Sequence, residues 1–422
     1  MRIAFFSPPL WSHLAVYRAL AGALAKRGHG CFLIGHPDLG GFDGGSLALA
    51  ALDPAGCAWN PESVTANARR PGLPFGILRV VNDMAAMTRS LCLQGPALLR
   101  ELGIDGVVSD QMESAGAIVA EHLNLPFVTV ASALPVNREP SIPLPVLDWP
   151  WEDSAAALKR NRGGEWVADL LTRRIDRTIA AEAGRLGCAP KRRQADCLSP
   201  LAEIGQIVPG FDFPRRNLPA HFHPVGPLRD GVRGGAPLPP IPSGKPLVFC
   251  SFGTLQGHRL GLFRRVAKAC RQVGTRLLAA HCGGLSPEQA TTVDADWVVD
   301  RVDQEEAVRR ADVVVTHGGL NTALDALAAG TPMLVIPLAF DQPGVAARVR
   351  HLGAGEVVSS RPCAATLAQA LGRLLSDKGF GERAGSLKHE FVAAGGAARA
   401  ASVIEQALCE RRPVPRQEAL AA

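Results

Sequence analysis

The sequence lacks the features that mark several common protein classes. No stretch of 18 consecutive apolar residues occurs, so we expect no segment to span a membrane. The ten cysteines include no CxxC pair and follow no regular spacing, which argues against a metal site or a disulfide framework. Cysteines within apolar runs, such as Cys250 and Cys270, are instead expected to be buried, reduced thiols.

Long clusters of basic residues are also missing. The net charge is +6, but basic residues are scattered in short local clusters such as Lys159, Arg160 and Arg162, which favours a solvated surface and excludes nucleic acid as the expected partner. With 47% apolar and 20% charged residues, the composition is typical of a globular protein. A length of 422 residues suits two domains of about 200 residues each.

The N-terminal segment does not resemble a signal peptide. Its apolar run breaks at Ser7-Pro8-Pro9, and the helix expected after it is amphipathic and carries Arg18, Lys26 and Arg27. We therefore expect a cytoplasmic protein, with contact to the inner face of the membrane as a further expectation. The sequence does not indicate an oligomeric state.

Short apolar runs alternate with helical patterns along the whole chain. Expected strands are 2–6, 31–35, 106–110 and 127–132 in the first half, and 248–252, 277–281, 297–300, 312–316 and 333–337 in the second. Expected helices in the first half include 13–27, 84–102 and 114–123. This alternation predicts an α/β protein with two parallel sheets, each covered by helices on both faces.

Residues 226–246 hold five glycines and six prolines in 21 positions, a composition that excludes a helix or an inner strand. We therefore interpret this segment as a linker between an N-terminal domain, residues 1–225, and a C-terminal domain, residues 247–396. A terminal helix near 397–411 and a basic tail complete the segment 397–422, which could pack back on the N-terminal domain.

The most informative stretch is HGGLNTALDALAAGTPMLVIPLAFDQ, residues 317–342, where an apolar strand turns into a helix. Such a turn directs free backbone N–H groups and the positive end of a helix dipole to one point, which suits a phosphate. Gly318 and Gly319 allow close approach of a ligand, and His317 can donate a further hydrogen bond. Asp325 follows at a distance along the helix that suits a ribose hydroxyl. The stretch predicts a site for an activated sugar nucleotide.

Two other segments of the second half could complete this site. Gly253 and Thr254 follow a buried strand, at the edge where open α/β sheets bind ligands, although such a turn by itself is more often only a turn. Asp303 and Glu306 form the pattern of a capping box, a structural role that accounts for both. Arg301, Val302 and Gln304 surround that cap and could line a base pocket, since a guanidinium can stack on a planar base.

In the first half, His13 lies where the first strand meets its helix, and Asp110 ends a later strand. A histidine in a first helical turn is often structural. A buried carboxylate bonded to one ring nitrogen would, however, orient the ring and raise its basicity. No G-x-S-x-G elbow supplies a serine nucleophile, so a general base that activates a hydroxyl is favoured over a hydrolase.

Two further motifs are absent. There is no GxGxxG, so dinucleotide binding gains no support. No DxD element stands in a strand-end loop, although DAD occurs at 294–296. We therefore expect no metal and no cofactor, with helix dipoles and His317 stabilising a leaving diphosphate.

Together these residues resemble the donor-binding signature of UDP-glycosyltransferases, which have the GT-B fold of two Rossmann-like domains facing across a cleft. The signature consists of Gln304, the run His317, Gly319, Asn321, Thr322 and Asp325, and the pair Asp341-Gln342. The strings SDQMESAG, LPVNREP, SFGTLQGHR, AHCG and AFDQPGVAARV are similar to those of bacterial zeaxanthin glucosyltransferases of carotenoid biosynthesis.

The resemblance implies a role for each matching residue. His13 would be the catalytic base and Asp110 its orienting acid. The diphosphate would be bound by Gly253, Thr254, His317, Gly318, Asn321 and Thr322. Arg301, Val302 and Gln304 would hold uracil, Asp325 the ribose, and Asp341 and Gln342 the glucose hydroxyls. Many plant relatives have Trp in place of Arg301 and Glu in place of Asp325, so the uracil and ribose contacts depart from the family pattern.

The implied reaction is an inverting, metal-independent transfer of glucose from UDP-glucose to the hydroxyl groups of a carotenoid such as zeaxanthin. Residues 82–93, with adaptable methionines, and 141–151, with Trp149 and Trp151, are candidates for an apolar acceptor pocket and a membrane contact. Alternatives are transfer to a macrolide, sterol or flavonoid-like acceptor, a UDP-sugar 2-epimerase, and a non-catalytic sugar-nucleotide-binding protein.

Overall fold

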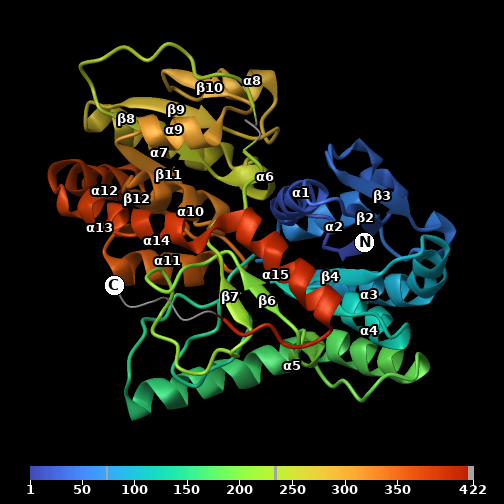
Figure 1. Ribbon diagram of the computed structural model, residues 1–422. Coiled ribbons are helices and arrows are strands. Elements are labelled where there is room, and N and C mark those ends of the chain that lie inside the picture. Colours follow the sequence, from blue (N-terminus) through green and yellow to red (C-terminus); the bar gives the residue numbers. More distant parts are fainter. Residues whose placement is uncertain (73–74, 232–234, 417–422) are drawn as a thin grey trace.

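The computed structural model describes residues 1–72, 75–231 and 235–416 (Figure 1). Its framework consists of two separate parallel β-sheets, each flanked by helices. The predicted architecture, two Rossmann-like α/β domains that face each other across a cleft, is confirmed.

The first sheet has the strand order β3-β2-β1-β4-β5-β6-β7, and all neighbouring strands pair in parallel. The chain therefore moves outward from β1 in one direction as far as β3 and then returns to the other side of β1 with β4. The strands are β1 (Arg2–Phe6), β2 (Gly30–Gly35), β3 (Leu47–Ala51), β4 (Gly106–Asp110), β5 (Phe127–Ala131), β6 (Glu203–Gly205) and β7 (Phe222–Pro224).

Helices bury both faces of this sheet, which explains why its central strands are almost entirely apolar. One face packs against α1 and the C-terminal helix, and the other against α3, α4 and α5. The helices of this domain are α1 (Trp11–Ala25), α2 (Pro61–Ala68), α3 (Gly76–Glu101), α4 (Ala115–His122) and α5 (Ala155–Arg185).

The second sheet repeats the same plan with the order β10-β9-β8-β11-β12-β13, again parallel throughout. Its strands are β8 (Leu247–Ser251), β9 (Arg276–Ala280), β10 (Trp297–Val299), β11 (Val313–Thr316), β12 (Met333–Val335) and β13 (Gly355–Val357). Its helices are α6 (Gly253–Gln256), α7 (Leu260–Gln272), α8 (Pro287–Ala290), α9 (Gln304–Arg310), α10 (Leu320–Ala329), α11 (Gln342–Leu352), α12 (Ala364–Ser376), α13 (Gly379–Gly385) and α14 (Lys388–Ala394).

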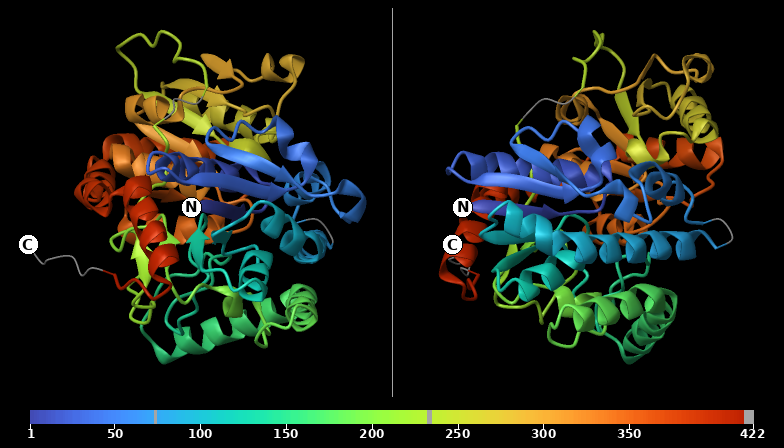
Figure 2. Two further views of the ribbon diagram at one scale, coloured as in Figure 1. Left: turned by 45° about the vertical axis from the view of Figure 1, so that its right-hand side comes forward. Right: turned by 90° about the vertical axis from the view of Figure 1, so that its right-hand side faces the viewer.

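The chain crosses between the domains twice. After β7 it runs through residues 226–246, whose described part contains no helix or strand; residues 232–234 lie outside the described residues. It returns through α15 (Gly396–Glu410), which packs on the first sheet together with α1 (Figures 1 and 2). The two crossings meet, because the Gly396 N–H donates to the Val225 carbonyl at 2.7 Å.

The segment after α15 lies across the edge of the first sheet. The Val414 N–H donates to the Leu201 carbonyl at 2.9 Å, and its own carbonyl accepts from His223 Nε2 at 3.0 Å. The Val414 side chain is buried in the same core as α15. Of the tail expected from the sequence, residues 417–422 lie outside the described residues.

Several expected features have other bounds or contacts than the sequence indicated. Helix α3 begins at Gly76, eight residues before the start expected from the pattern of residues 84–102. The capping box at α9 is only half formed: Asp303 accepts from the Glu306 N–H at 3.1 Å, but Glu306 pairs with Arg309 instead of reaching back. The physical reason is that the Asp303 N–H already donates to the Ala236 carbonyl at 3.0 Å.

Cys250 and Cys270 are buried, free thiols, as expected, whereas Cys363 and Cys409 are exposed. Among the helices that the structure describes, none is long and apolar enough to cross a membrane.

A buried ion pair joins the two domains beneath the cleft. Arg348 on α11 is fully buried, and its Nε donates to Asp212 Oδ1 of the N-terminal domain at 2.6 Å. Arg215 donates to the other oxygen of the same carboxylate at 2.6 Å, and the Arg348 guanidinium lies 4.4 Å from the Phe213 ring centroid. Burial alone would raise the pKa of Asp212, but the two arginines hold it below its usual value. The pair should therefore stabilise the interface at neutral pH.

We predict that Arg348→Met lowers the free energy of unfolding by about 3 kcal/mol, since it leaves a buried carboxylate with one partner fewer. The measurement is urea unfolding at pH 7, with Arg350→Met on the exposed face of the same helix as the control. Because the Asp212 pKa is lowered by folding, this stabilisation is present at neutral pH and is lost on acidification. Equal stability of the two variants at pH 7 would contradict the assignment.

Candidate active site between the two domains

The candidate site lies where the strand order of each sheet reverses. In the first sheet β1 and β4 are neighbours, with Phe6 paired to Ser109, and in the second β8 and β11 are neighbours, with Ser251 paired to Thr316. Open α/β sheets bind ligands outside the carboxyl ends of strands at this point. The two reversal points face the same cleft, which has a volume of about 1010 Å³.

His13 and Asp110, predicted as a pair, are in contact. His13 Nδ1 lies 2.7 Å from Asp110 Oδ2, so Nδ1 carries the proton and Nε2 is the basic nitrogen. Asp110 also accepts from the Ser132 hydroxyl and from the Met112 N–H, the latter at 2.8 Å. Burial lowers the pKa of His13, but the charge and hydrogen bond of Asp110 outweigh it and raise the pKa above 6.5. This geometry is that of an oriented general base.

Asp341, predicted to bind a sugar, faces this histidine from the other domain. Its Oδ2 accepts from the Leu134 N–H of the N-terminal domain at 3.3 Å, and its charge contributes to the raised pKa of His13. Burial raises the pKa of Asp341 itself. The Gln342 amide oxygen accepts from the N–H groups of Leu338 and Ala339, so its amide nitrogen is the end suited to a sugar hydroxyl.

His317 is enclosed between two glycines. A Cβ atom at Gly253 would lie 3.0 Å from the His317 ring, and one at Gly319 would lie 2.7 Å from its Nε2, so no side chain fits at either position. Gly253 also has a φ of +64°, which favours glycine. Burial lowers the pKa of His317 to about 4. The ring is therefore neutral near pH 7 and can serve a phosphate as a hydrogen-bond donor, not as a charge.

The remaining residues expected at the diphosphate divide into two groups. Thr254, Gly319, Asn321 and Thr322 line the cleft. Gly318 does not: its N–H donates to Thr316 Oγ1 at 3.2 Å, and a Cβ there would lie 2.9 Å from Val335. With a φ of +83°, Gly318 shapes the turn that starts α10.

The residues predicted for uracil and ribose lie together at one side of the cleft. Gln304 Nε2 donates to Asp325 Oδ2 at 2.7 Å, and Arg229 donates to Asp325 Oδ1 at 2.7 and 2.9 Å. The Arg301 guanidinium lies 5.3 Å from the Trp11 ring centroid of the N-terminal domain. Val302 is largely buried, beside Gly235 of the linker.

Asn321 connects the two halves of the site. Its Nδ2 donates to the Ser12 carbonyl at 3.1 Å, and its Oδ1 accepts from Gln206 Nε2 at 2.9 Å. Ser12, the residue before the candidate base His13, is thus hydrogen-bonded directly to the first turn of α10.

Four side chains of the site were not found from the sequence: Trp11, Ser132, Gln206 and Arg229. Ser132 ends the expected strand 127–132, at the same sheet edge as Asp110, and that position could have indicated it. Gln206 and Arg229 lie in loops, where no local pattern marks a site residue.

The outer part of the cleft is apolar and lies between α2, α3 and α5. Its lining includes Val64, Val80, Val81, Met84, Met87 and Ile175. The methionines of the segment 82–93 therefore face the cleft as well as the core. Trp149 and Trp151, expected at a membrane contact, are half-buried and pack against Arg160 and His351 respectively. Among the described residues, no three His, Cys, Asp or Glu side chains gather in a group that could hold a metal ion.

Comparison with known proteins gives concordant matches. Residues 285–406 match the family described as erythromycin biosynthesis protein CIII-like, C-terminal domain. The zeaxanthin glucosyltransferase of Pseudescherichia vulneris is 42% identical over 415 residues, which are 96% of this chain and 97% of that protein. The zeaxanthin glucosyltransferase of Pantoea ananas is 41% identical over 419 residues, 97% of each.

Solved structures match in fold. The glycotransferase of kitacinnamycin has a TM-score of 0.74 at 19% identity, covering 96% of this chain and 98% of that one. The calicheamicin glycosyltransferase CalG4 has a TM-score of 0.70 at 21% identity, covering 98% and 99%. At this level of identity the likeness shows the two-domain GT-B fold alone.

The contact between His13 and Asp110 predicts a measurable titration. His13 should titrate above 6.5 in the native protein, and Asp110→Asn should lower its pKa, because the variant loses the carboxylate that favours the charged ring. Histidine NMR across pH 5–9 gives both values, with His317 as an internal reference that stays neutral throughout. An unchanged His13 titration in the variant would contradict the pairing.

Proposed function

The chain belongs to the zeaxanthin glucosyltransferase family, and on that premise we propose that it transfers glucose from UDP-glucose to the hydroxyl groups of zeaxanthin with inversion at the sugar. The observation that carries this proposal is the placement of an oriented base, His13, opposite the neutral donor His317 across a cleft with an apolar outer half.

The acceptor step follows from the geometry of His13. Its Nε2 takes the proton of the acceptor hydroxyl as the oxygen forms a bond to the anomeric carbon, and the bond from that carbon to the diphosphate breaks. Asp110 accepts from Nδ1 and stabilises the imidazolium that forms. Attack from the face opposite the leaving group converts an α-linked donor into a β-glucoside. Asp341 lies near His13, where a hydroxyl of the transferred glucose would be held.

The donor half acts on the leaving diphosphate. The N–H groups at the start of α10, the Thr254 and Thr322 side chains, and neutral His317 supply hydrogen-bond donors at the point where negative charge develops. Asp325 would bind the ribose: its two oxygens accept from Arg229 and Gln304, and a carboxylate has about four lone-pair sites, which leaves capacity for a hydroxyl. Arg301 would stack on uracil, and Val302 and Gln304 would complete the base pocket.

The acceptor is recognised by apolar contact. A carotenoid is a long apolar molecule with polar ends, and the lining from α2, α3 and α5 offers unbranched and branched apolar side chains, among them Met84 and Met87. Because such an acceptor resides in a bilayer, we extend the proposal to work at the cytoplasmic face of a membrane, without a spanning segment.

The test is incubation of the protein with UDP-glucose, with and without zeaxanthin. We expect a glucoside only when both are present, and His13→Ala to lower the rate by about 10²- to 10⁴-fold while UDP binding is retained. Near-normal transfer by His13→Ala would show that the base is elsewhere. Isomerisation of UDP-glucose alone, or UDP-glucose binding with no turnover, would overturn the proposed reaction.

We also propose that the transfer requires no metal ion, since hydrogen-bond donors and the start of α10 serve the diphosphate. Treatment with EDTA should leave the rate unchanged within about twofold. Loss of activity in EDTA that is restored by Mg²⁺ would overturn this part of the proposal.

A further inference from the structure

Exposed apolar side chains are concentrated in two short segments of the N-terminal domain. The described part of the chain exposes eleven large apolar side chains, and seven of them lie at the start of α3 or in the middle of α5. They are Phe75, Ile77 and Leu78, and Trp166, Val167, Leu170 and Leu171. Phe75 is 73% exposed and Trp166 is 67% exposed. We call these seven residues the apolar face.

The two segments of the apolar face lie side by side. Helices α3 and α5 run in the same direction, because Arg89 contacts Glu182 at 3.8 Å, and Arg100 and the Leu186 carbonyl both contact His122 further along. Ile77 of α3 lines the same cleft as Ala168 and Thr172, the residues of α5 on either side of Leu170. The start of α3 reaches the side of the molecule away from both chain ends (Figure 2, right).

The apolar face adjoins the mouth of the acceptor cleft. Ile77 and Val80 on α3, and Ala168 and Thr172 on α5, line the cleft from the same two helices. The same two helices therefore supply both the apolar face and part of the cleft lining. Because the apolar face adjoins the cleft, we interpret it as a functional surface and not as a chance group of exposed side chains.

Basic residues flank the apolar face. Helix α5 carries seven Lys or Arg residues against four Asp or Glu. Arg79, Arg173 and Arg174 are exposed next to its apolar residues. Apolar side chains bordered by exposed arginines fit an anionic lipid surface.

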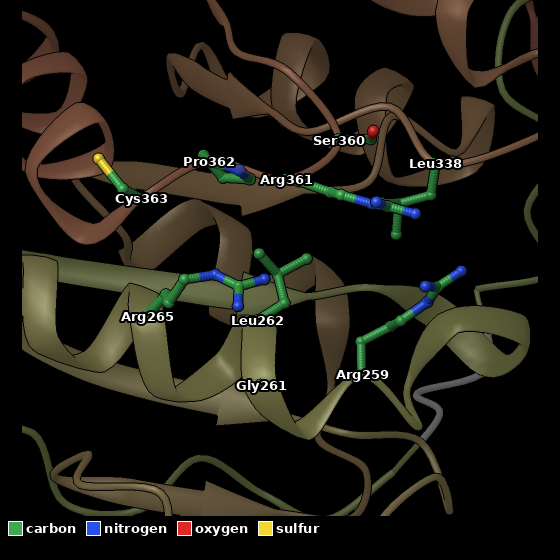
Figure 3. Close-up of a pocket in the computed structure, with 9 residues that line it drawn as sticks. All are labelled: Arg259, Gly261, Leu262, Arg265, Leu338, Ser360, Arg361, Pro362 and Cys363. Atoms are coloured by element: carbon green, nitrogen blue, oxygen red, sulfur yellow. The ribbon is translucent and has the colours of Figure 1, made fainter.

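A second cavity, outside the catalytic cleft, supplies an anion site. It has a volume of about 500 Å³, and Figure 3 shows Arg259, Arg265 and Arg361 around it. No acidic residue is among those that line it. The Nε of Arg265 is buried without a hydrogen-bond partner. We call this cavity the arginine pocket.

The basic groups in and beside the arginine pocket repel one another. Burial, and the charges of Arg70 and Arg361, lower the pKa of Arg259. An anion bound between these guanidinium groups would relieve that repulsion. The forked guanidinium donors match the oxygens of a phosphate.

The arginine pocket lies against the start of α3. Gln256 links the two, since its Nε2 donates to the Arg69 carbonyl at 3.4 Å and its Oε1 accepts from Arg259 Nε at 2.8 Å. Backbone packing continues the link, because a Cβ at Gly76 would lie 2.6 Å from the Arg70 carbonyl oxygen. The pocket is thus at the edge of the apolar face.

We propose that the apolar face and the arginine pocket together form a docking surface for an anionic lipid bilayer. The seven apolar side chains enter the acyl boundary, the flanking arginines contact headgroups, and the pocket takes one lipid phosphate. The inference rests on the proposed function, because an acceptor dissolved in the bilayer is what gives this surface its use. Docked in this way, the cleft mouth opens onto the lipid.

The first test is flotation of the full-length protein with vesicles of phosphatidylcholine, with and without phosphatidylglycerol. We expect binding to the anionic vesicles and a blue shift of tryptophan fluorescence. The combined variant Phe75→Ser, Leu78→Ser, Trp166→Ser and Leu170→Ser should lower the floated fraction by about tenfold. Val392→Ser removes an equally exposed apolar side chain elsewhere and should bind as the native protein does. Equal flotation of the two variants would contradict the role of the apolar face in vesicle binding.

The second test separates the lipid phosphate from a free anion. Arg259→Gln with Arg361→Gln should reduce binding to anionic vesicles toward the level seen with phosphatidylcholine alone, and Arg412→Gln should not. Unchanged anionic binding in the double variant would overturn the role of the pocket. If inorganic phosphate raises the melting temperature through these two arginines while no vesicle binds, the site takes free anions and the lipid assignment is wrong.

Failure of the docking surface is distinguishable from failure of the proposed reaction. None of the four substituted apolar residues lines the cleft, so transfer to zeaxanthin delivered in detergent should match the native rate in the combined variant. Native protein that floats with vesicles but forms no glucoside in detergent would contradict the reaction alone. A melting temperature and UDP binding like those of the native protein show that the variants are folded.

Discussion

Parallel pairing between β1 and β4 is the constraint on which the rest of the site depends. Residues 13 and 110 are far apart in the chain, and only this pairing brings the start of α1 next to the end of β4. The second sheet repeats the arrangement with β8 and β11, which brings Gly253 against His317. In the proposed reaction each domain therefore supplies one half of the chemistry, and the acceptor and the donor meet in the cleft between the two reversal points.

The neighbours of two histidines in this cleft shift their pKa values in opposite directions. His13 has a carboxylate partner that outweighs the effect of burial, so its pKa rises. His317 is surrounded by glycine backbone and has no such partner, so burial lowers its pKa to about 4. The first can accept a proton and hold the charge, whereas the second stays a neutral hydrogen-bond donor. Transfer of a sugar between a hydroxyl and a diphosphate needs both roles at once.

Strand-end residues of the site could be predicted from the sequence, and loop and long-helix features could not. His13, Asp110 and His317 each lie at or just after the end of an apolar strand, a local signal that also gives the fold class. Arg229 contacts Asp325 from the linker. Because the linker is rich in glycine and proline and has no periodic pattern, its sequence does not predict where its side chains lie. Helix α5 was not predicted, because its Gly163-Gly164 pair and its many charged residues obscure the helical pattern of its apolar residues. The structure shows that these apolar residues pack against α3. The contacts of Trp149 and Trp151 were likewise set by tertiary packing, not by their proline-rich segment.

The meeting of the two chain crossings at Val225 and Gly396 has a mechanical consequence. The two crossings therefore lie side by side, and Gly226, Gly395 and Gly396 have positive φ angles there, a conformation that glycine adopts more readily than other residues. A rotation of one domain about this point displaces the far rim of the cleft more than the residues near the crossings, because displacement grows with distance from the axis.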